Sequence, residues 1–379
     1  MSKIHEKKTI VAIFVTFILA AFLVNAFADD LAIALWKLFP SGELMLAKVQ
    51  AASLQSSDGV TFQMIAARVL AGADFGKEIE LRNQGVNASD AVRRVAVGET
   101  IIVTKNQDFT NDAYVMLDRL RLKPLLFILL FFIFLAVLVG KSRGITSLLG
   151  LGISLAVVFG FVIPGILAGH SATVFAFIGA LVIAPASLYL THGFNKQTSI
   201  AVLGTMLSLG IAYALCLIFV SGAKLIGIQN EQLFYIQTVS GAPLNLPDLL
   251  IAAIIIGTLG VLEDITIAQS VTVFEIKKAN PRLGSMELYE AGSSIGREHI
   301  GSLINTLVLA YAGTSLPDLL YIAFQNKNLP FWLVLNGEQL ADEIVRVAVG
   351  GSALIIALPL TTALAAFFFG KDNITRKIR

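Results

Sequence analysis

Residues 124–140 read PLLFILLFFIFLAVLVG, an apolar run without a single charged side chain. A bilayer core about 30 Å thick is crossed by a helix of about 20 such residues. The whole chain of 379 residues shares this character, because 56% of it is hydrophobic and only 14% is charged. Soluble domains carry roughly 25% charged residues. The sequence therefore predicts an integral membrane protein.

Net charge and cysteine content exclude further kinds of partner and site. The formal net charge is +2, which provides no global basic field for nucleic acid. The single cysteine, Cys216, excludes a disulfide within the chain and a zinc site built on cysteines. We expect no cofactor and no nucleic-acid partner.

Seven other runs are similar to residues 124–140, which predicts an all-α membrane bundle of about eight transmembrane helices. The predicted spans are residues 9–28, 124–140, 145–168, 171–191, 199–220, 248–267, 300–324 and 344–370. Lys3, Lys7 and Lys8 precede the first span. We interpret this span as an uncleaved signal anchor, because its apolar run is longer than a typical signal-peptide core. A cleaved signal peptide is the alternative.

Positive charges gather in alternate loops, and this pattern sets the predicted orientation. Lys141 and Arg143 mark one cytoplasmic loop, Lys196 marks the next, and four basic residues within 277–297 mark a third. The intervening loops carry few positive charges. Because cytoplasmic loops are enriched in Lys and Arg, both termini are expected inside. The sequence thus predicts a multi-pass protein of the cell membrane.

A segment of different composition separates the first two spans. The predicted domains are the anchor 1–28, an extracytoplasmic β-rich domain 29–123, and a seven-helix membrane domain 124–379. Short β-like runs occur at residues 43–51, 60–70, 77–82, 100–104 and 114–120. Between residues 62 and 69, two sets of residues alternate at a period of two, as in a strand. One set is Gln63, Ile65, Ala67 and Val69, and the other is Phe62, Met64, Ala66 and Arg68. Five short strands suggest a small barrel of the OB or a similar type.

This outer domain has two open interpretations. It lacks the basic stripe with interleaved aromatic rings that single-stranded nucleic acid requires. We favour a structural cap or assembly module, and a ligand-binding role is the alternative.

A pair of adjacent carboxylates lies within the sixth predicted span. Ionisable residues inside a span are costly and by default mark function. The candidate site residues on this helix are Glu263, Asp264, Thr266, Ser270 and Glu275. Two adjacent carboxylates repel each other unless a proton or cation lies between them, which suits a proton- or cation-coupled site. The alternative is that they reach the cytoplasmic headgroups or pair with nearby basic side chains.

The seventh predicted helix continues this polar pattern. Glu298, Ser302 and Asn305 are spaced i, i+4, i+7, and His299 and Thr306 lie alongside them. These residues form one polar face, which we expect to meet the carboxylates of the sixth span. The alternative is that Ser and Asn only hold helices together, with His299 as a structural cap.

Three stretches resemble one known family. They are GTLGVLEDITIAQSVTVFEI at 257–276, GREHIGSLINTLVLAYAG at 296–313 and, more briefly, HGFNKQT at 192–198. They look like elements of the YibE/F-like family of bacterial multi-pass membrane proteins. The resemblance covers the membrane region and, more loosely, the outer β domain. It implies a multi-helix membrane protein with a shared polar centre, and it implies little about activity.

Individual positions carry over from this resemblance. The family's acidic residues fall on Asp264, Glu275 and Glu298, its Asn-Thr on Asn305-Thr306, and its Tyr on Tyr311. The family is Ser-rich after its first acidic residue, whereas Ala268 and Gln269 interrupt that run here. Glu263 is an extra carboxylate beside the family position.

Two function classes remain open. The first is a secondary transporter or channel-like permease that moves a small solute, proton or cation through the polar centre. The second is a non-transport scaffold or sensor whose outer domain binds a partner. An enzyme is disfavoured, because the chain has no His-Glu-x-x-His and no Gly-x-Ser-x-Gly motif. The expected partners are the lipid bilayer and either a second copy or a related membrane protein.

Overall fold

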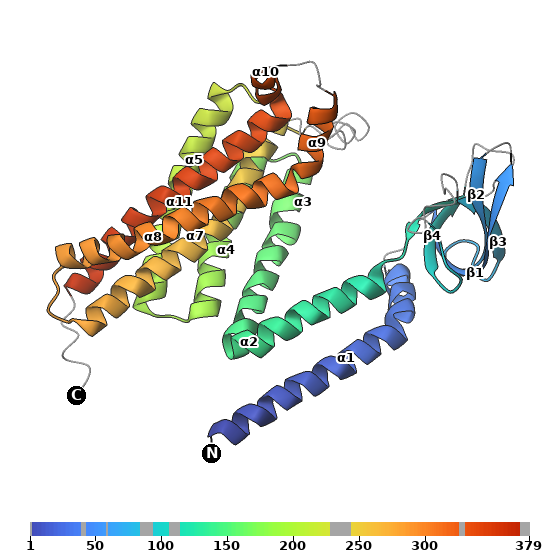
Figure 1. The fold of residues 1–379 in the computed structure, drawn as a ribbon, viewed down its shortest axis with the longest axis horizontal. Coiled ribbons are helices and arrows are strands. Elements are labelled where there is room, and N and C mark those ends of the chain that lie inside the picture. Colours follow the sequence, from blue (N-terminus) through green and yellow to red (C-terminus); the bar gives the residue numbers. More distant parts are fainter. Residues whose placement is uncertain are drawn as a thin grey trace. The chain divides into compact units, whose positions relative to one another are not determined.

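The structure is a computed structural model in two compact units, Met1–Gly144 and Ile145–Arg379, which are described separately. It describes residues 2–38, 43–57, 60–83, 94–105, 114–227, 244–325 and 330–371. Figure 1 shows a small sheet in the first unit and a bundle of long helices in the second.

Within the described residues, five strands form one antiparallel sheet in the first unit. They are β1 (Leu44–Ser57), β2 (Val60–Ala71), β3 (Glu78–Asn83), β4 (Thr100–Lys105) and β5 (Tyr114–Arg119). Their order is β3-β2-β1-β4-β5, and the edge strands β3 and β5 also contact each other. The sheet therefore curls around a single apolar core. The five predicted strands are confirmed, and β1 is longer than predicted because it pairs with β2 as far as Ser57.

The predicted period-two alternation of β2 is confirmed, and the structure shows which of its two faces is buried. Gln63, Ile65 and Val69 are buried, whereas Arg68 is exposed. Gln63 is a polar residue inside the sheet, and its side-chain amide exchanges two hydrogen bonds with the backbone of Val95, at 2.8 and 2.9 Å. Both polar ends of this buried amide are thus satisfied, as burial requires.

A second buried polar group in this unit is the carboxylate of Asp74, which is only 5% exposed. Lys105 lies 2.8 Å and Lys77 lies 2.5 Å from its oxygens, and the Tyr114 hydroxyl donates a hydrogen bond of 2.9 Å. The hydrogen bonds from Lys105, Lys77 and Tyr114 hold the pKa of the Asp74 carboxyl well below its usual range. This cluster ties the β2–β3 turn to β4 and β5.

The first helix, α1 (Ser2–Leu38), continues past the predicted end of the anchor at Ala28. Its last turns stay helical because Ala32 and Trp36 pack on an apolar patch of the sheet that includes Leu46 and Ala71. Asp29 accepts a hydrogen bond of 3.2 Å from Lys48. The charges at this point therefore mark where the helix meets the β sheet, and they do not end the helix.

The range α2 (Leu122–Val157) covers two helices joined by a kink, which correspond to the second predicted span and the start of the third. Its backbone leaves the helical region at Lys141, with φ 53° and ψ −129°, where the sequence predicts a loop. A π-helical turn (Val158–Val162) and the short helix α3 (Ile163–Leu167) complete this run. The π turn directly precedes Pro164, a residue that cannot donate a backbone hydrogen bond within a helix.

The second unit is built around α7 (Leu246–Ala279). Helices α4 (Ala172–His192), α5 (Lys196–Gly222), α8 (Ser285–Thr314) and α11 (Glu338–Gly370) all contact it. Asn245 caps the start of α7 by accepting a hydrogen bond from the Asp248 backbone, and Pro247 occupies the first turn. The central position of α7 places its polar residues among four neighbours.

Six helical stretches in the described residues are long and apolar enough to cross a membrane. They are Ile13–Leu38, Leu122–Leu167, Ala172–His192, Lys196–Gly222, Leu246–Ala279 and Glu338–Gly370. Helix α8 is not among them. The predicted span 300–324 is wrong as a single helix, because α8 ends at Thr314 and α9 (Leu316–Gln325) follows. The count of eight spans stays a prediction.

Candidate functional site

The carboxylate of Glu263 lies at the contact between α7 and α4. Its Oε2 accepts a hydrogen bond of 3.1 Å from the hydroxyl of Ser187 on α4. Its Oε1 is buried and has no hydrogen-bond partner among the described residues. Buried carboxylate oxygens are normally satisfied, and an exception calls for an explanation such as an ion, a water or a functional role. Among the described residues, only one of the two carboxylate oxygens is therefore satisfied.

Thr266 and Ser270 lie on the same face of α7 as Glu263 and contact α5. The hydroxyl oxygens of Thr266 and Thr205 are 2.7 Å apart, and both side chains are fully buried. Ser270 donates a hydrogen bond of 2.8 Å to the backbone carbonyl of Gln197. The predicted stripe Glu263, Thr266, Ser270 is thus turned inward, towards α4 and α5.

Close helix contacts at glycines extend this polar region to α8 and α11. A Cβ atom added at Gly204 on α5 would lie 2.4 Å from the hydroxyl oxygen of Thr361 on α11. Gln269 on α7 donates a hydrogen bond of 2.8 Å to the carbonyl of Gly292 on α8. Small residues such as glycine let membrane helices approach this closely. The following hydroxyls of these helices are buried without a hydrogen-bond partner among the described residues: Ser208, Thr258, Ser293 and Thr361.

The second carboxylate of the pair, Asp264, points away from this interior and is exposed. It lies close enough to His192, at the end of α4, for an electrostatic interaction. Glu275 is also exposed and pairs with Lys278 one turn on, at 3.3 Å. Glu263 and Asp264 therefore differ sharply in surroundings although they are adjacent in sequence.

The polar face of α8 does not join the residues on α7. Glu298, His299, Ser302, Asn305 and Thr306 are all exposed. The buried face of α8 is instead the one that carries Gly292, Ser293, Gly296 and Leu307. The structure thus does not bring the polar face of α8 against the buried stripe of α7, and a cavity shared by the two faces stays a prediction. The physical reason for Glu298 and Asn305 is that α8 packs through the face of Gly292 and Gly296, and these two side chains lie roughly on the opposite face. His299 and Thr306 lie nearer the glycine side and are exposed as well.

The sequence did not mark several polar residues that the structure buries or bonds inside the helical unit. Ser187 and Thr205 lie in spans that have no ionisable residue, so nothing marked them. Asp342 is fully buried at the start of α11, just before the predicted span 344–370. Its position at the edge of an apolar run was the one available signal for a buried acid.

The chemistry open to this arrangement is that of oxygen ligands. Within the described residues, no three His, Cys, Asp or Glu side chains gather to hold a metal ion. One carboxylate with neighbouring hydroxyls can hold a proton or give a few ligands to a hard cation, which prefers oxygen.

Comparisons with known proteins place the chain in a family. Neither a search of curated proteins nor a search of solved structures found a match. The family model described as YibE/F-like protein matches residues 128–371, which include α4, α5, α7, α8 and α11. This match covers more than half of the chain, so the protein belongs to the YibE/F-like family.

Proposed function

We propose that the protein is a secondary transporter or channel-like permease for a small solute or ion, with Glu263 as its proton- or cation-binding residue. The observation that carries the proposal is the Glu263 carboxylate, with one oxygen bonded to Ser187 and the other buried without a partner. A carboxylate kept inside a membrane helix is costly. A proton or cation bound there offsets that cost.

The hydroxyls inside the bundle support a path for such a ligand. Ser208, Thr258 and Thr361 come from three different helices, and none has a hydrogen-bond partner among the described residues. Buried polar groups without partners are costly unless water or an ion satisfies them. A hydrated or partly dehydrated cation that crosses the bundle would meet these oxygens.

The proposed setting is the cell membrane, with both termini in the cytoplasm and the β sheet outside. The six membrane-capable helical stretches support a multi-pass protein. The orientation is tested with reporter fusions that are active in the cytoplasm. Fusions after Lys196 and Lys278 should be active and a fusion after Ser57 inactive. Activity at Ser57 would reverse the proposed orientation.

The central test compares Glu263→Gln with Asp264→Asn in proteoliposomes. Each substitution removes one charge at nearly constant shape, and the two positions are adjacent on α7. Proton flux is read with an enclosed pH-sensitive dye under imposed gradients of Na⁺, K⁺ or Mg²⁺. We expect Glu263→Gln to abolish flux and Asp264→Asn to retain most of it, because only Glu263 is directed into the bundle.

The two variants also separate transport from folding. Thermal unfolding of the purified variants shows whether a loss of flux follows from a loss of structure. Glu263→Gln at wild-type stability and wild-type flux contradicts the proposal. Loss of flux in Asp264→Asn alone would indicate that the exposed carboxylate of Asp264, and not Glu263, binds the ion.

A scaffold or sensor is the second candidate, and the interhelical hydrogen bonds favour it. Gln269 bonds to α8, and Ser270 bonds to the start of α5. Such contacts hold membrane helices together without any transported ligand. In this case the exposed polar face of α8 would meet a second copy or a related membrane protein. Glu263→Gln would then alter stability, and no gradient would drive flux in the wild-type protein.

A further inference from the structure

A separate cavity of about 730 Å³ lies at one end of the helical unit. Its walls come from the end of α8, from α9, from α10 (Phe331–Leu335) and from the start of α11. None of the thirteen residues that line it belongs to α7, so it is distinct from the Glu263 site. Its volume lies within the range of about 300–1,000 Å³ typical of small-molecule sites.

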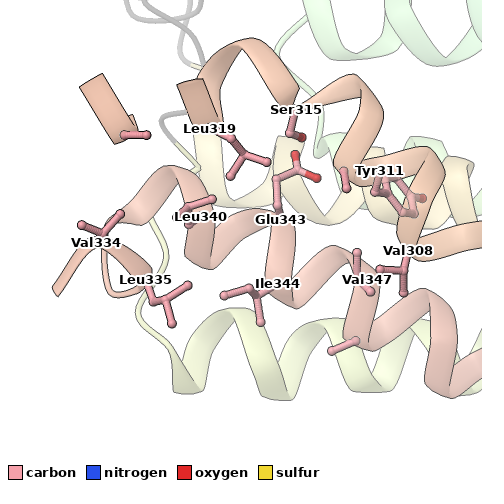
Figure 2. Close-up of a pocket in the computed structure, with 13 residues that line it drawn as sticks. Val308, Tyr311, Ser315, Leu319, Val334, Leu335, Leu340, Glu343, Ile344 and Val347 are labelled. Carbon is pink, nitrogen blue, oxygen red and sulfur yellow. The ribbon is translucent and has the colours of Figure 1, made fainter. Parts of the chain in front are cut away.

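The lining is apolar with a few polar groups on one side. Apart from Tyr311, Ser315 and Glu343, every lining residue is Ala, Val, Leu or Ile. Figure 2 shows the Glu343 carboxylate directed towards the wall that carries Ser315, and not into the apolar part formed by Leu335 and Ile344. The cavity thus has an apolar body and a single acidic end.

The carboxylate of Glu343 is only partly satisfied. Its Oε1 lies 3.6 Å from the guanidinium of Arg346, one turn on in α11. Arg346 also lies over the ring of Tyr311, 6.0 Å from its centre, and is not among the lining residues. Glu343 Oε2 is buried and has no hydrogen-bond partner among the described residues. One carboxylate oxygen at the cavity therefore lacks a donor.

We propose that this cavity binds an amphipathic amine, with its apolar chain against the Val, Leu and Ile walls and its ammonium group donating to Glu343 Oε2. An ammonium group supplies both the missing donor and the opposite charge. An anionic head is opposed by the carboxylate, because no Lys or Arg lines the cavity among the residues that the structure describes. A wholly apolar ligand would leave Oε2 without a donor, which is costly for a buried group.

The test uses octylammonium and 1-octanol as probes of the full chain in detergent. They share one apolar chain and differ in charge at the head. Binding is measured from the rise in the unfolding midpoint with probe concentration. Both heads can donate a hydrogen bond to Glu343 Oε2, but only the ammonium adds the opposite charge, which should favour octylammonium by about tenfold or more in apparent affinity. Equal affinity for the two probes in the wild-type protein overturns the proposal.

Three variants locate the effect. Glu343→Gln should remove the preference for the amine and keep the binding of 1-octanol. Glu290→Gln, which removes an exposed charge of α8 outside the cavity, should retain the tenfold preference. Ala312→Phe fills part of the cavity and should weaken the binding of both probes. This variant tests the site even if Glu343→Gln fails to fold. A preference for the amine that survives Glu343→Gln, or probe binding unchanged in Ala312→Phe, contradicts the assignment.

The same chemistry occurs in a free alkylamine and in a phosphatidylethanolamine headgroup. Nanodiscs of phosphatidylethanolamine and of phosphatidylcholine separate the two sources, because only the former carries N–H donors. Weaker binding of octylammonium in phosphatidylethanolamine nanodiscs assigns the cavity to the lipid. Equal binding in both assigns it to a free amine.

Discussion

Helices α7 and α8 carry similar polar stripes, and the structure turns them in opposite directions. On α7, Thr266 and Ser270 are buried and bonded to α5. On α8, Ser302 and Asn305 are exposed. Both stripes consist of small hydroxyl or amide residues beside a carboxylate. Composition alone therefore does not decide which stripe lies inside a bundle.

The position of glycine explains the difference. Gly292 and Gly296 lie on the face of α8 that contacts α7 and α11, where an added Cβ would fall within 3 Å of neighbouring side chains. At about 100° per residue, Asn305 lies about 140–180° from these two glycines, on the opposite face, and Ser302 lies about 80–120° from them, at the side of the helix. The closest packing goes to the face with the smallest residues. A helix face that carries glycines can thus be buried while a polar face of the same helix stays exposed.

Thiol labelling gives the largest expected contrast between the two helices. Ser302→Cys and Asn305→Cys on α8 should react with a maleimide in the purified folded protein. Ser270→Cys and Thr266→Cys on α7 should react only after denaturation. The native Cys216 is buried and should contribute little background. Mass spectrometry before and after unfolding counts the labels.

The opposite pattern of labelling would contradict the orientation of the two helices. Protection of Ser302→Cys and Asn305→Cys together with reaction at Ser270→Cys would exchange the inner and outer faces. Protection at all four positions would mean that another protein, such as a second copy, covers α8.

A pair of glycine substitutions tests the packing argument and should have the next largest effect. At Gly296 a new Cβ would lie 2.5 Å from a methyl carbon of Leu358 and 2.9 Å from Gln269 Oε1. At Gly301, on the same helix, nothing lies within 4 Å. Gly296→Val should lower the free energy of unfolding by about 1–3 kcal/mol. Gly301→Val should leave it nearly unchanged, as measured by thermal or denaturant unfolding.

Equal stability of the two variants would refute the glycine explanation. Some other contact would then decide which face of α8 is buried.

The sequence was most informative where a pattern directly specifies a face. In β2 a residue's parity decides its side of the sheet, so alternation places Ile65 and Val69 on one face, and the structure shows that this face is buried. The apolar runs likewise specify membrane helices by length. The end of α1 was less predictable, because Asp29 and Asp30 suggest a boundary. Only the contact of Ala32 and Trp36 with the sheet keeps that segment helical.

The candidate site was only partly predictable, because its partners come from distant parts of the chain. Helical spacing correctly groups Glu263, Thr266 and Ser270 on one stripe of α7. It does not reveal that Ser187, 76 residues earlier, bonds to Glu263. It also does not reveal that Asp264 faces outward. A helical period gives the relative directions of side chains on one helix, and the neighbouring helices decide which direction is the interior.

The smallest predicted effect concerns single hydroxyl groups on the two helices. Thr266 shares a short contact with Thr205 inside the bundle, whereas Thr306 on α8 is exposed and donates to the carbonyl of Ser302 in its own helix. Valine has nearly the shape of threonine without the hydroxyl. Thr266→Val should cost about 0.6–1.7 kcal/mol of unfolding free energy. Thr306→Val should cost much less, because no interhelical bond is lost.

A double-mutant cycle decides whether the Thr205–Thr266 contact is the cause. Thr266→Val leaves the buried hydroxyl of Thr205 without its partner, and that orphaned group accounts for much of the loss. In Thr205→Val with Thr266→Val, both hydroxyls are gone and no polar group is left orphaned. The double variant should therefore be more stable than the two single losses added together predict. Strict additivity would mean that the two hydroxyls do not interact. The inward stripe of α7 would then gain no more from its hydroxyls than the outward stripe of α8.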